Sequence, residues 1–360
     1  MKKIIFILLA AVAIVGCSGN GGGGKKSSFF AQKSVGTPYE LLVVCNHDLW
    51  DAPAGQALKE VLTSDIPGLP QSEPSFRVSQ VSPSSFTQMF KPFRNIIDVQ
   101  IDPTRYTQSK FKYTRDKYAE PQMVLTIQSP NAIEFQKFVE DNGQTIIDFF
   151  TSAEMNRELD ELKKDYQRAF LDSIRKKFDC DMHIPTYLTA IKSEKDFLWA
   201  SDMNNAGKET IENIVVYSFP YTDVKLFTRE NFIKKRNEIL KRHIRGGRED
   251  RYMTTDTLLS DTRETSFRDR YMLEARGLWA MENDMMGGPY VSHSFVDEVN
   301  GKIIVAEAFV YAPSTDKRKM MRKLEAALFS LKLPADRQIE NSMQIPVIII
   351  EDTIKNDTNK

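Results

Sequence analysis

Three residues near the middle of the chain alternate in a pattern that could bind a metal ion. Asp179, Asp181 and His183 occupy every second position. If this stretch forms a strand, alternate side chains point to one face, so two carboxylates and an imidazole would lie together. Such a donor set suits a divalent cation. The sequence identifies no further ligands, and the alternative is the polar beginning of a strand that faces solvent.

A second group of residues could bind a ligand or a partner. Residues 287–289 (Gly-Gly-Pro) predict a rigid turn between two apolar stretches. Large apolar side chains around such a turn could line a pocket or form a contact surface. The alternative is a place in the hydrophobic core. The residues concerned are Trp279, Met285, Met286 and Tyr290.

The sequence contains none of the common catalytic signatures. It has no Gly-x-Ser-x-Gly, no phosphate-binding loop, no His-Glu-x-x-His and no dinucleotide fingerprint. We therefore name no catalytic residue, expect no cofactor and favour a noncatalytic binding or assembly module over an enzyme. The alternative is a hydrolase with an unrecognised carboxylate or metal site.

Composition narrows the class of protein. The 360 residues include 49 Lys and Arg and 49 Asp and Glu, so the formal net charge is zero. Without an overall positive field, binding to nucleic acid is not expected. Hydrophobic residues make up 41%, which is typical of a globular protein.

Three Cys are too few for a disulfide scaffold, and Cys45 and Cys180 could be either a disulfide pair or small buried side chains.

The N-terminus predicts export and lipid attachment. Lys2 and Lys3 precede an uncharged apolar run at residues 4–16, which is too short to span a bilayer and fits a signal peptide. The run ends in a small residue, Gly16, before Cys17, and so resembles the lipobox of bacterial lipoproteins. The resemblance implies cleavage after residue 16 and lipid on the sulfur and the new amino group of Cys17.

A flexible tether is expected after the lipid. Residues 17–36 are rich in Gly, Ser and Lys and would span about 25 Å as a random coil. Ser18, and not Asp, follows the lipidated Cys, and by resemblance to envelope sorting rules this favours the outer membrane. No acidic cluster of the kind that marks surface export follows the Cys, which favours the periplasmic face. The expected partners are the membrane, through the lipid, and an envelope protein, glycan or lipid.

The pattern of apolar residues predicts an α+β fold with mixed or antiparallel sheets and packed helices. We expect an N-terminal α/β half at residues 37–152, a C-terminal α+β half at residues 153–340 and a tail at residues 341–360. The second half opens with a long amphipathic helix, and a hairpin followed by a helix occurs twice, which suggests a duplication. These two units are residues 197–219 with 229–243 and residues 270–311 with 316–332.

The lipobox and three short segments carry a family resemblance. Residues 39–44 (YELLVV), together with residues 277–279 (GLW) and 287–289 (GGP), resemble a family of Bacteroidetes lipoproteins known as domain of unknown function 4837. The likeness would extend over residues 37–345. The family has no established activity, so the resemblance implies a source and a location but no catalytic residues.

Overall fold

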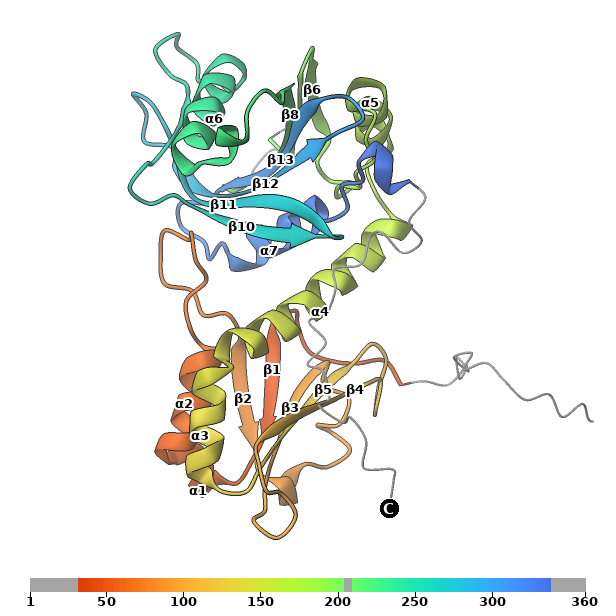
Figure 1. Ribbon diagram of the computed structural model, residues 1–360, viewed down its shortest axis with the longest axis vertical. Coiled ribbons are helices and arrows are strands. Elements are labelled where there is room, and N and C mark those ends of the chain that lie inside the picture. The colour runs from red at the N-terminus through yellow and green to blue at the C-terminus, as the bar shows by residue number, and fades with distance from the viewer. Residues whose placement is uncertain (1–31, 204–208, 338–360) are drawn as a thin grey trace, which may run out of the picture. The chain divides into compact units, whose positions relative to one another are not determined.

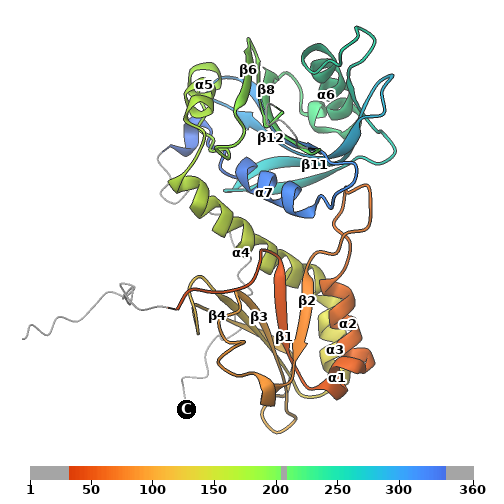
Figure 2. The same ribbon diagram turned by 180° about the vertical axis from the view of Figure 1, so that it is seen from behind.

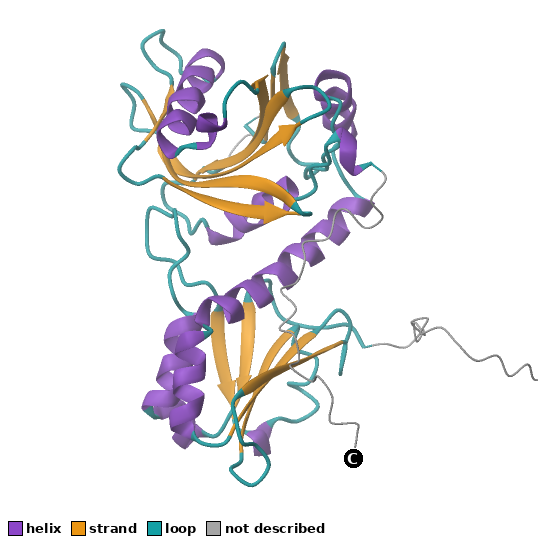
Figure 3. Cartoon of the chain, in the orientation of Figure 1, coloured by secondary structure: helices purple, strands orange, loops and turns teal. Residues whose placement is uncertain are grey.

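Two β-sheets, each covered by helices, organise the chain (Figure 1). The computed structural model describes residues 32–203 and 209–337. One sheet is mixed and the other is antiparallel, so the predicted α+β class is confirmed (Figure 3). Among the described residues, no helix has both the length and the apolar character needed to cross a membrane.

The smaller sheet has five strands in the order β2-β1-β3-β5-β4. All neighbouring strands are parallel except β4, which runs antiparallel to β5. Both faces of β1 are buried, which explains its uninterrupted apolar sequence. The strands are β1 (Glu40–Val44), β2 (Arg77–Val81), β3 (Asn95–Ile101), β4 (Lys110–Arg115) and β5 (Met123–Ser129).

Helices cover one face of this small sheet. Gly143 begins α4, and a Cβ at this position would lie 2.9 Å from a methyl group of Val61. The glycine therefore allows α4 to pack closely on α2. The helices are α1 (His47–Asp51), α2 (Pro53–Leu62), α3 (Ala132–Asp141) and α4 (Gly143–Lys164), with a short 3₁₀ turn at Pro83–Ser85.

The larger sheet has eight strands. Seven follow the order β10-β11-β12-β13-β8-β7-β6, and β9 pairs with β11. Gly301 has a φ of +63° in the turn between β12 and β13, where the sequence predicts a hairpin. The strands are β6 (Ala190–Glu194), β7 (Phe197–Ser201), β8 (Ile211–Pro220), β9 (Met253–Thr255), β10 (Asp261–Phe267), β11 (Arg270–Met281), β12 (Gly287–Asp297) and β13 (Lys302–Tyr311).

Helices lie on both faces of this large sheet (Figures 1 and 2). α7 packs on the face that carries Ile304 and Ala306, and α6 packs on the face that carries Ile303 and Val305. The two predicted hairpin–helix units thus place their helices on opposite faces. The helices are α5 (Arg168–Phe178), α6 (Arg229–His243) and α7 (Arg318–Leu328), with 3₁₀ turns at Val224–Phe227 and Pro334–Asp336.

One helix supplies side chains to the cores of both sheets. Phe149 and Phe150 of α4 are buried against the small sheet, whereas Leu159 and Leu162 are buried in the core of the large sheet. The division between halves that we expect at residues 152 and 153 falls inside this helix.

The structure differs from the sequence prediction at residues 179–183. The alternating pattern there would suit a strand, but β6 begins only at Ala190. Cys45 and Cys180 are free thiols in separate hydrophobic cores, and burial raises the pKa of Cys45 to about 11. The expected signal peptide, Cys17, most of the expected tether and the expected tail at residues 341–360 lie outside the described residues.

Candidate functional site

The structure does not assemble Asp179, Asp181 and His183 into one site. Asp179 ends α5 with left-handed backbone, at a φ of 59°, and its carboxylate bonds to Arg337. Asp181 accepts a hydrogen bond of 2.7 Å from Nε of Arg175, and His183 stacks on an aromatic ring. A helix end and two arginine pairs therefore stand where the sequence predicts a strand with three side chains on one face.

The second predicted group is divided between core and solvent. Trp279 and Tyr290 are buried, and Nε1 of Trp279 donates a hydrogen bond of 3.2 Å to the carbonyl of Val310. Met286 packs partly buried against the same core, whereas Met285 is fully exposed. The alternative interpretation, a place in the core, therefore describes the two aromatic residues.

The glycines of the same segment allow backbone segments to approach closely. A Cβ on Gly277 would lie 2.2 Å from Oγ of Ser260, and a Cβ on Gly288 would lie 2.0 Å from the carbonyl oxygen of Val310. Both distances are far below van der Waals contact, so a larger residue at either position would push the two backbone segments apart. These motif glycines therefore serve packing.

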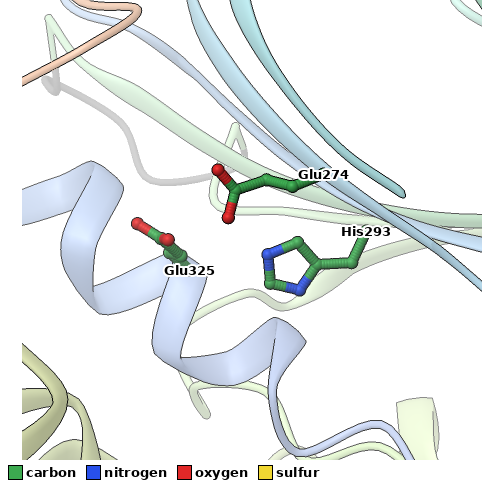
Figure 4. Close-up of side chains that lie close together, drawn as sticks. All are labelled: Glu274, His293 and Glu325. Carbon is green, nitrogen blue, oxygen red and sulfur yellow. The ribbon is translucent and has the colours of Figure 1, made fainter. Parts of the chain in front are cut away.

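A cluster of buried charged side chains lies between the large sheet and α7 (Figure 4). Glu274 on β11 and His293 on β12 stand directly opposite each other, and Glu325 projects toward them from α7. All three residues are buried, and one ligand atom of each lies within 4.8 Å of the others. We call these three residues the carboxylate–histidine cluster.

Two arginines balance the charge of this cluster. Nε of Arg276 donates to Glu274 at 2.8 Å, and its Nη1 donates to Glu325 at 3.2 Å. Arg263 adds a longer hydrogen bond of 3.3 Å to Glu274. Burial alone would raise the pKa of Glu274, but the charge and hydrogen bond of Arg276, together with the neighbouring charge of Arg263, outweigh burial and hold that pKa well below its usual range. The carboxylates are thus engaged in an ion-pair network.

The imidazole of His293 has no hydrogen-bond partner in the described part of the chain, on either ring nitrogen. Burial lowers its pKa to about 4, so the ring is neutral at pH 7. A neutral imidazole beside two carboxylates is a recognised ligand set for divalent cations, and it is the one such group of three within residues 32–203 and 209–337. A cation would have to displace Arg276, which already bonds to both carboxylates.

Two cavities open beside α7. The first, of about 300 Å³, is bordered by Glu274 and Arg276 on the large sheet and by residues 64–67, which precede β2. The second, of about 480 Å³, includes Tyr39 at the beginning of the small sheet. Arg322 of α7 lines both cavities.

The Arg322 side chain is buried without a partner of opposite charge. Its residue is 8% exposed, and no hydrogen bond or ion pair joins its guanidinium to any residue that the structure describes. The guanidinium carbon lies 5.5 Å from the centre of the Tyr39 ring. Because an unpaired buried charge costs several kcal/mol, its position beside two cavities indicates a site for an anionic group.

A network around Glu154 forms one wall of the second cavity. The Glu154 carboxylate pairs with Arg94 at 2.7 Å and with Arg157 at 2.7 Å. Asn95 donates a further hydrogen bond of 2.6 Å to the same carboxylate. These contacts fix the wall, because each arginine is held by the carboxylate between them.

Family models match two parts of the chain. Residues 167–330, which run from α5 through α7, match the family described as domain of unknown function DUF4837. This part of the chain belongs to the DUF4837 family. Residues 34–163 match a second model, domain of unknown function DUF8532. No curated protein matches the chain.

The DUF4837 match is narrower than the likeness over residues 37–345 that the sequence suggests. Residues 277–279 and 287–289 fall within the DUF4837 domain, whereas residues 39–44 fall in the DUF8532 match. Residues of both matched regions line each cavity. Arg322 of the DUF4837 match lines both, and within the DUF8532 match Ser64 lines the first cavity and Tyr39 the second. The candidate ligand site therefore lies where the two matched regions meet.

Sequence reasoning missed the carboxylate–histidine cluster and Arg322. A signal for the cluster exists, because Glu274 and His293 interrupt strands that are otherwise largely apolar, and such positions are expected to be buried. Arg322 carries no such signal, since a basic residue on an amphipathic helix normally faces solvent.

Proposed function

We propose that the protein is a lipid-anchored protein of the bacterial envelope and that it binds a small anionic ligand beside α7. Arg322 carries the second part of the proposal, because its buried guanidinium lines two cavities and has no partner among the described residues. A noncatalytic binding role explains why a positively charged side chain is buried at this position, and it does not require the protein to catalyse a reaction.

The lipid anchor rests on the sequence around Cys17. An apolar run of 13 residues that ends before Cys17 supports signal cleavage and lipid attachment. Ser18 supports the outer membrane, and the lack of an acidic cluster after Cys17 supports its periplasmic face. Cells grown with labelled palmitate should incorporate label into the protein. Cys17→Ala should abolish the label and move the protein out of the membrane fraction. Label that persists in the variant would contradict the anchor.

Ligand binding is tested by thermal unfolding of the full-length protein in detergent. Succinate and inorganic phosphate, compared with chloride at equal ionic strength, should raise the melting temperature if either anion binds the folded state. Arg322→Gln should remove the increase. An increase of equal size in the variant would show that the anions act elsewhere, and no increase in wild type would count against the binding role.

An envelope hydrolase with a metal site is the second candidate. The unpartnered imidazole of His293 beside Glu274 and Glu325 favours it, since the three side chains offer ligand atoms within 4.8 Å. The hydrogen bonds from Arg276 to both carboxylates oppose it. A wild-type protein that Zn²⁺ or Mn²⁺ stabilises and a chelator destabilises would support this alternative.

A further inference from the structure

We infer that the second cavity binds a phosphate monoester, with Arg322 as its principal contact. The inference rests on the proposed binding role and names the class of ligand. It follows from the excess of positive charge around the cavity, from the chemistry of the guanidinium group and from the residues at the cavity's edge.

One helix supplies three of the cavity's cations. Lys319, Arg322 and Lys323 of α7 all line the cavity, and none of them forms an ion pair with a described residue. Lys319 is exposed, Lys323 is half-buried over the ring of Tyr187, and Arg322 is buried. The positive charge therefore extends from the surface into the cavity.

The carboxylates of the cavity do not balance these three cations. Glu154 is held between two arginines, and Glu161 pairs with Lys164 at 2.7 Å. Glu158 remains, and it offsets one of the three positive charges. The surplus is thus close to two positive charges or more, which matches a ligand group that carries two negative charges.

Phosphate monoesters fit this charge and this geometry. Their second pKa lies near 6, so they carry about −1.5 to −2 charges at pH 7. The planar guanidinium of Arg322 can donate two parallel hydrogen bonds to phosphate oxygens, and the lysines add point charges. A cavity of about 480 Å³ lies within the usual range for small-ligand sites.

The edge of the cavity lies at the root of the expected tether. Ser34 and Pro38 line the cavity, and residues 17–36 would connect it to the lipid. A phosphate monoester could therefore come from a lipid headgroup in the anchoring membrane or from a soluble metabolite. The chemistry recognised by Arg322 is the same in both cases.

Isothermal titration of the full-length protein in detergent micelles tests the ligand class. The probes are glycerol 3-phosphate, dihexanoyl phosphatidic acid and succinate. Glycerol 3-phosphate should bind more tightly than succinate. Phosphatidic acid that binds more than tenfold tighter than glycerol 3-phosphate would support a lipid source, and similar affinities would support a soluble ester. If succinate binds more tightly than glycerol 3-phosphate and phosphatidic acid, the phosphate inference is overturned while the proposed binding of an anion stands. If no probe binds, the phosphate inference and the proposed binding of an anion are both overturned.

Variants locate the binding. Arg322→Gln should weaken glycerol 3-phosphate binding at least about tenfold, which is the effect of losing charge-assisted hydrogen bonds. Arg322→Lys should retain part of the affinity. Arg242→Gln is the matched control, because Arg242 lines a separate cavity on α6 that is also rich in basic residues. An equal loss in the control, or no loss in Arg322→Gln, would overturn the inference.

Discussion

Buried arginines beside the large sheet differ in what compensates their charge. Arg236 of α6 is fully buried and donates to both oxygens of Glu307, at 2.9 and 2.7 Å. Arg276 bonds to two carboxylates of the carboxylate–histidine cluster. Arg322 has no such partner among the described residues. The first two arginines stabilise the fold, and the third is available to a ligand.

His293 should make stability depend on pH. Burial lowers its pKa from 6.5 to about 4, and Glu274, Arg276 and Glu325 surround it. As the pH falls, His293 takes up a proton in the unfolded chain before it does so in the folded protein. The free energy of unfolding is therefore highest above pH 6.5 and decreases as the pH drops toward 4. The loss amounts to about 3 kcal/mol at most.

Urea unfolding of the full-length protein at pH 7 and pH 5 measures this effect. His293→Gln should remove most of the difference between the two pH values. His47→Gln replaces an exposed histidine and is the control. A pH dependence that survives in His293→Gln would assign it to other groups.

Removing Arg276 should create a metal site. Arg276→Gln leaves Glu274 and Glu325 buried without their main partner, at a cost of about 3–5 kcal/mol. The buried carboxylate pair, freed from Arg276, and the imidazole should then bind Zn²⁺, which raises the melting temperature of the variant but not of wild type. Arg263→Gln, which leaves Arg276 in place, should not respond. No response of Arg276→Gln to Zn²⁺ would exclude metal binding by the cluster.

At the residue scale, the sequence predicts chemistry where residues of one type lie close together in the chain. Asp179, Asp181 and His183 are such a case, and the left-handed end of α5 separates them. Glu274 and Glu325 lie far apart in the sequence and meet only because strand pairing and helix packing bring them together. A single sequence contains no direct record of such contacts.

At the scale of elements, α7 depends on a residue outside the DUF4837 match. Glu73 is buried, and its two oxygens accept hydrogen bonds from the backbone N–H groups of Lys317 and Arg318 at 2.8 and 2.7 Å. A carboxylate at a helix N-terminus satisfies free donors and favours the helix dipole. This contact holds the helix that carries Arg322.

Glu73→Gln should therefore weaken the attachment of α7. Gln keeps one acceptor oxygen but loses the charge, so we expect a loss of about 1–2 kcal/mol in unfolding free energy. Thermal and urea unfolding measure the loss, and the exposed Glu60→Gln of α2 is the control. Equal stability of the two variants would mean that the contact does not stabilise the helix.

Strands with polar sequences are the elements that sequence patterns miss. β4 and β10 lie at sheet edges and expose most of their side chains, so neither shows the apolar alternation that predicts a strand. Pairing with β5 and β11 stabilises them instead. The apolar strands β7 and β13, by contrast, lie within the two hairpins that the sequence predicts at residues 197–219 and 270–311.

At the scale of the whole molecule, the site combines residues from both matched regions. Arg322, Lys319 and Lys323 come from the DUF4837 domain, whereas Tyr39 and Glu154 come from the region that matches DUF8532. α4 contributes to the cores of both sheets, which ties the two regions together. The fold class follows from the sequence, but a site built from two distant regions does not.

We propose that Arg322 is retained for a ligand and not for the fold. Urea unfolding of Arg322→Gln and Arg236→Gln without added anions distinguishes these two roles. We predict that Arg322→Gln is as stable as wild type or more stable, because it removes an unpaired buried charge. Arg236→Gln should lose about 3–5 kcal/mol, since it leaves Glu307 buried without its partner. A loss of similar size in Arg322→Gln would contradict the account.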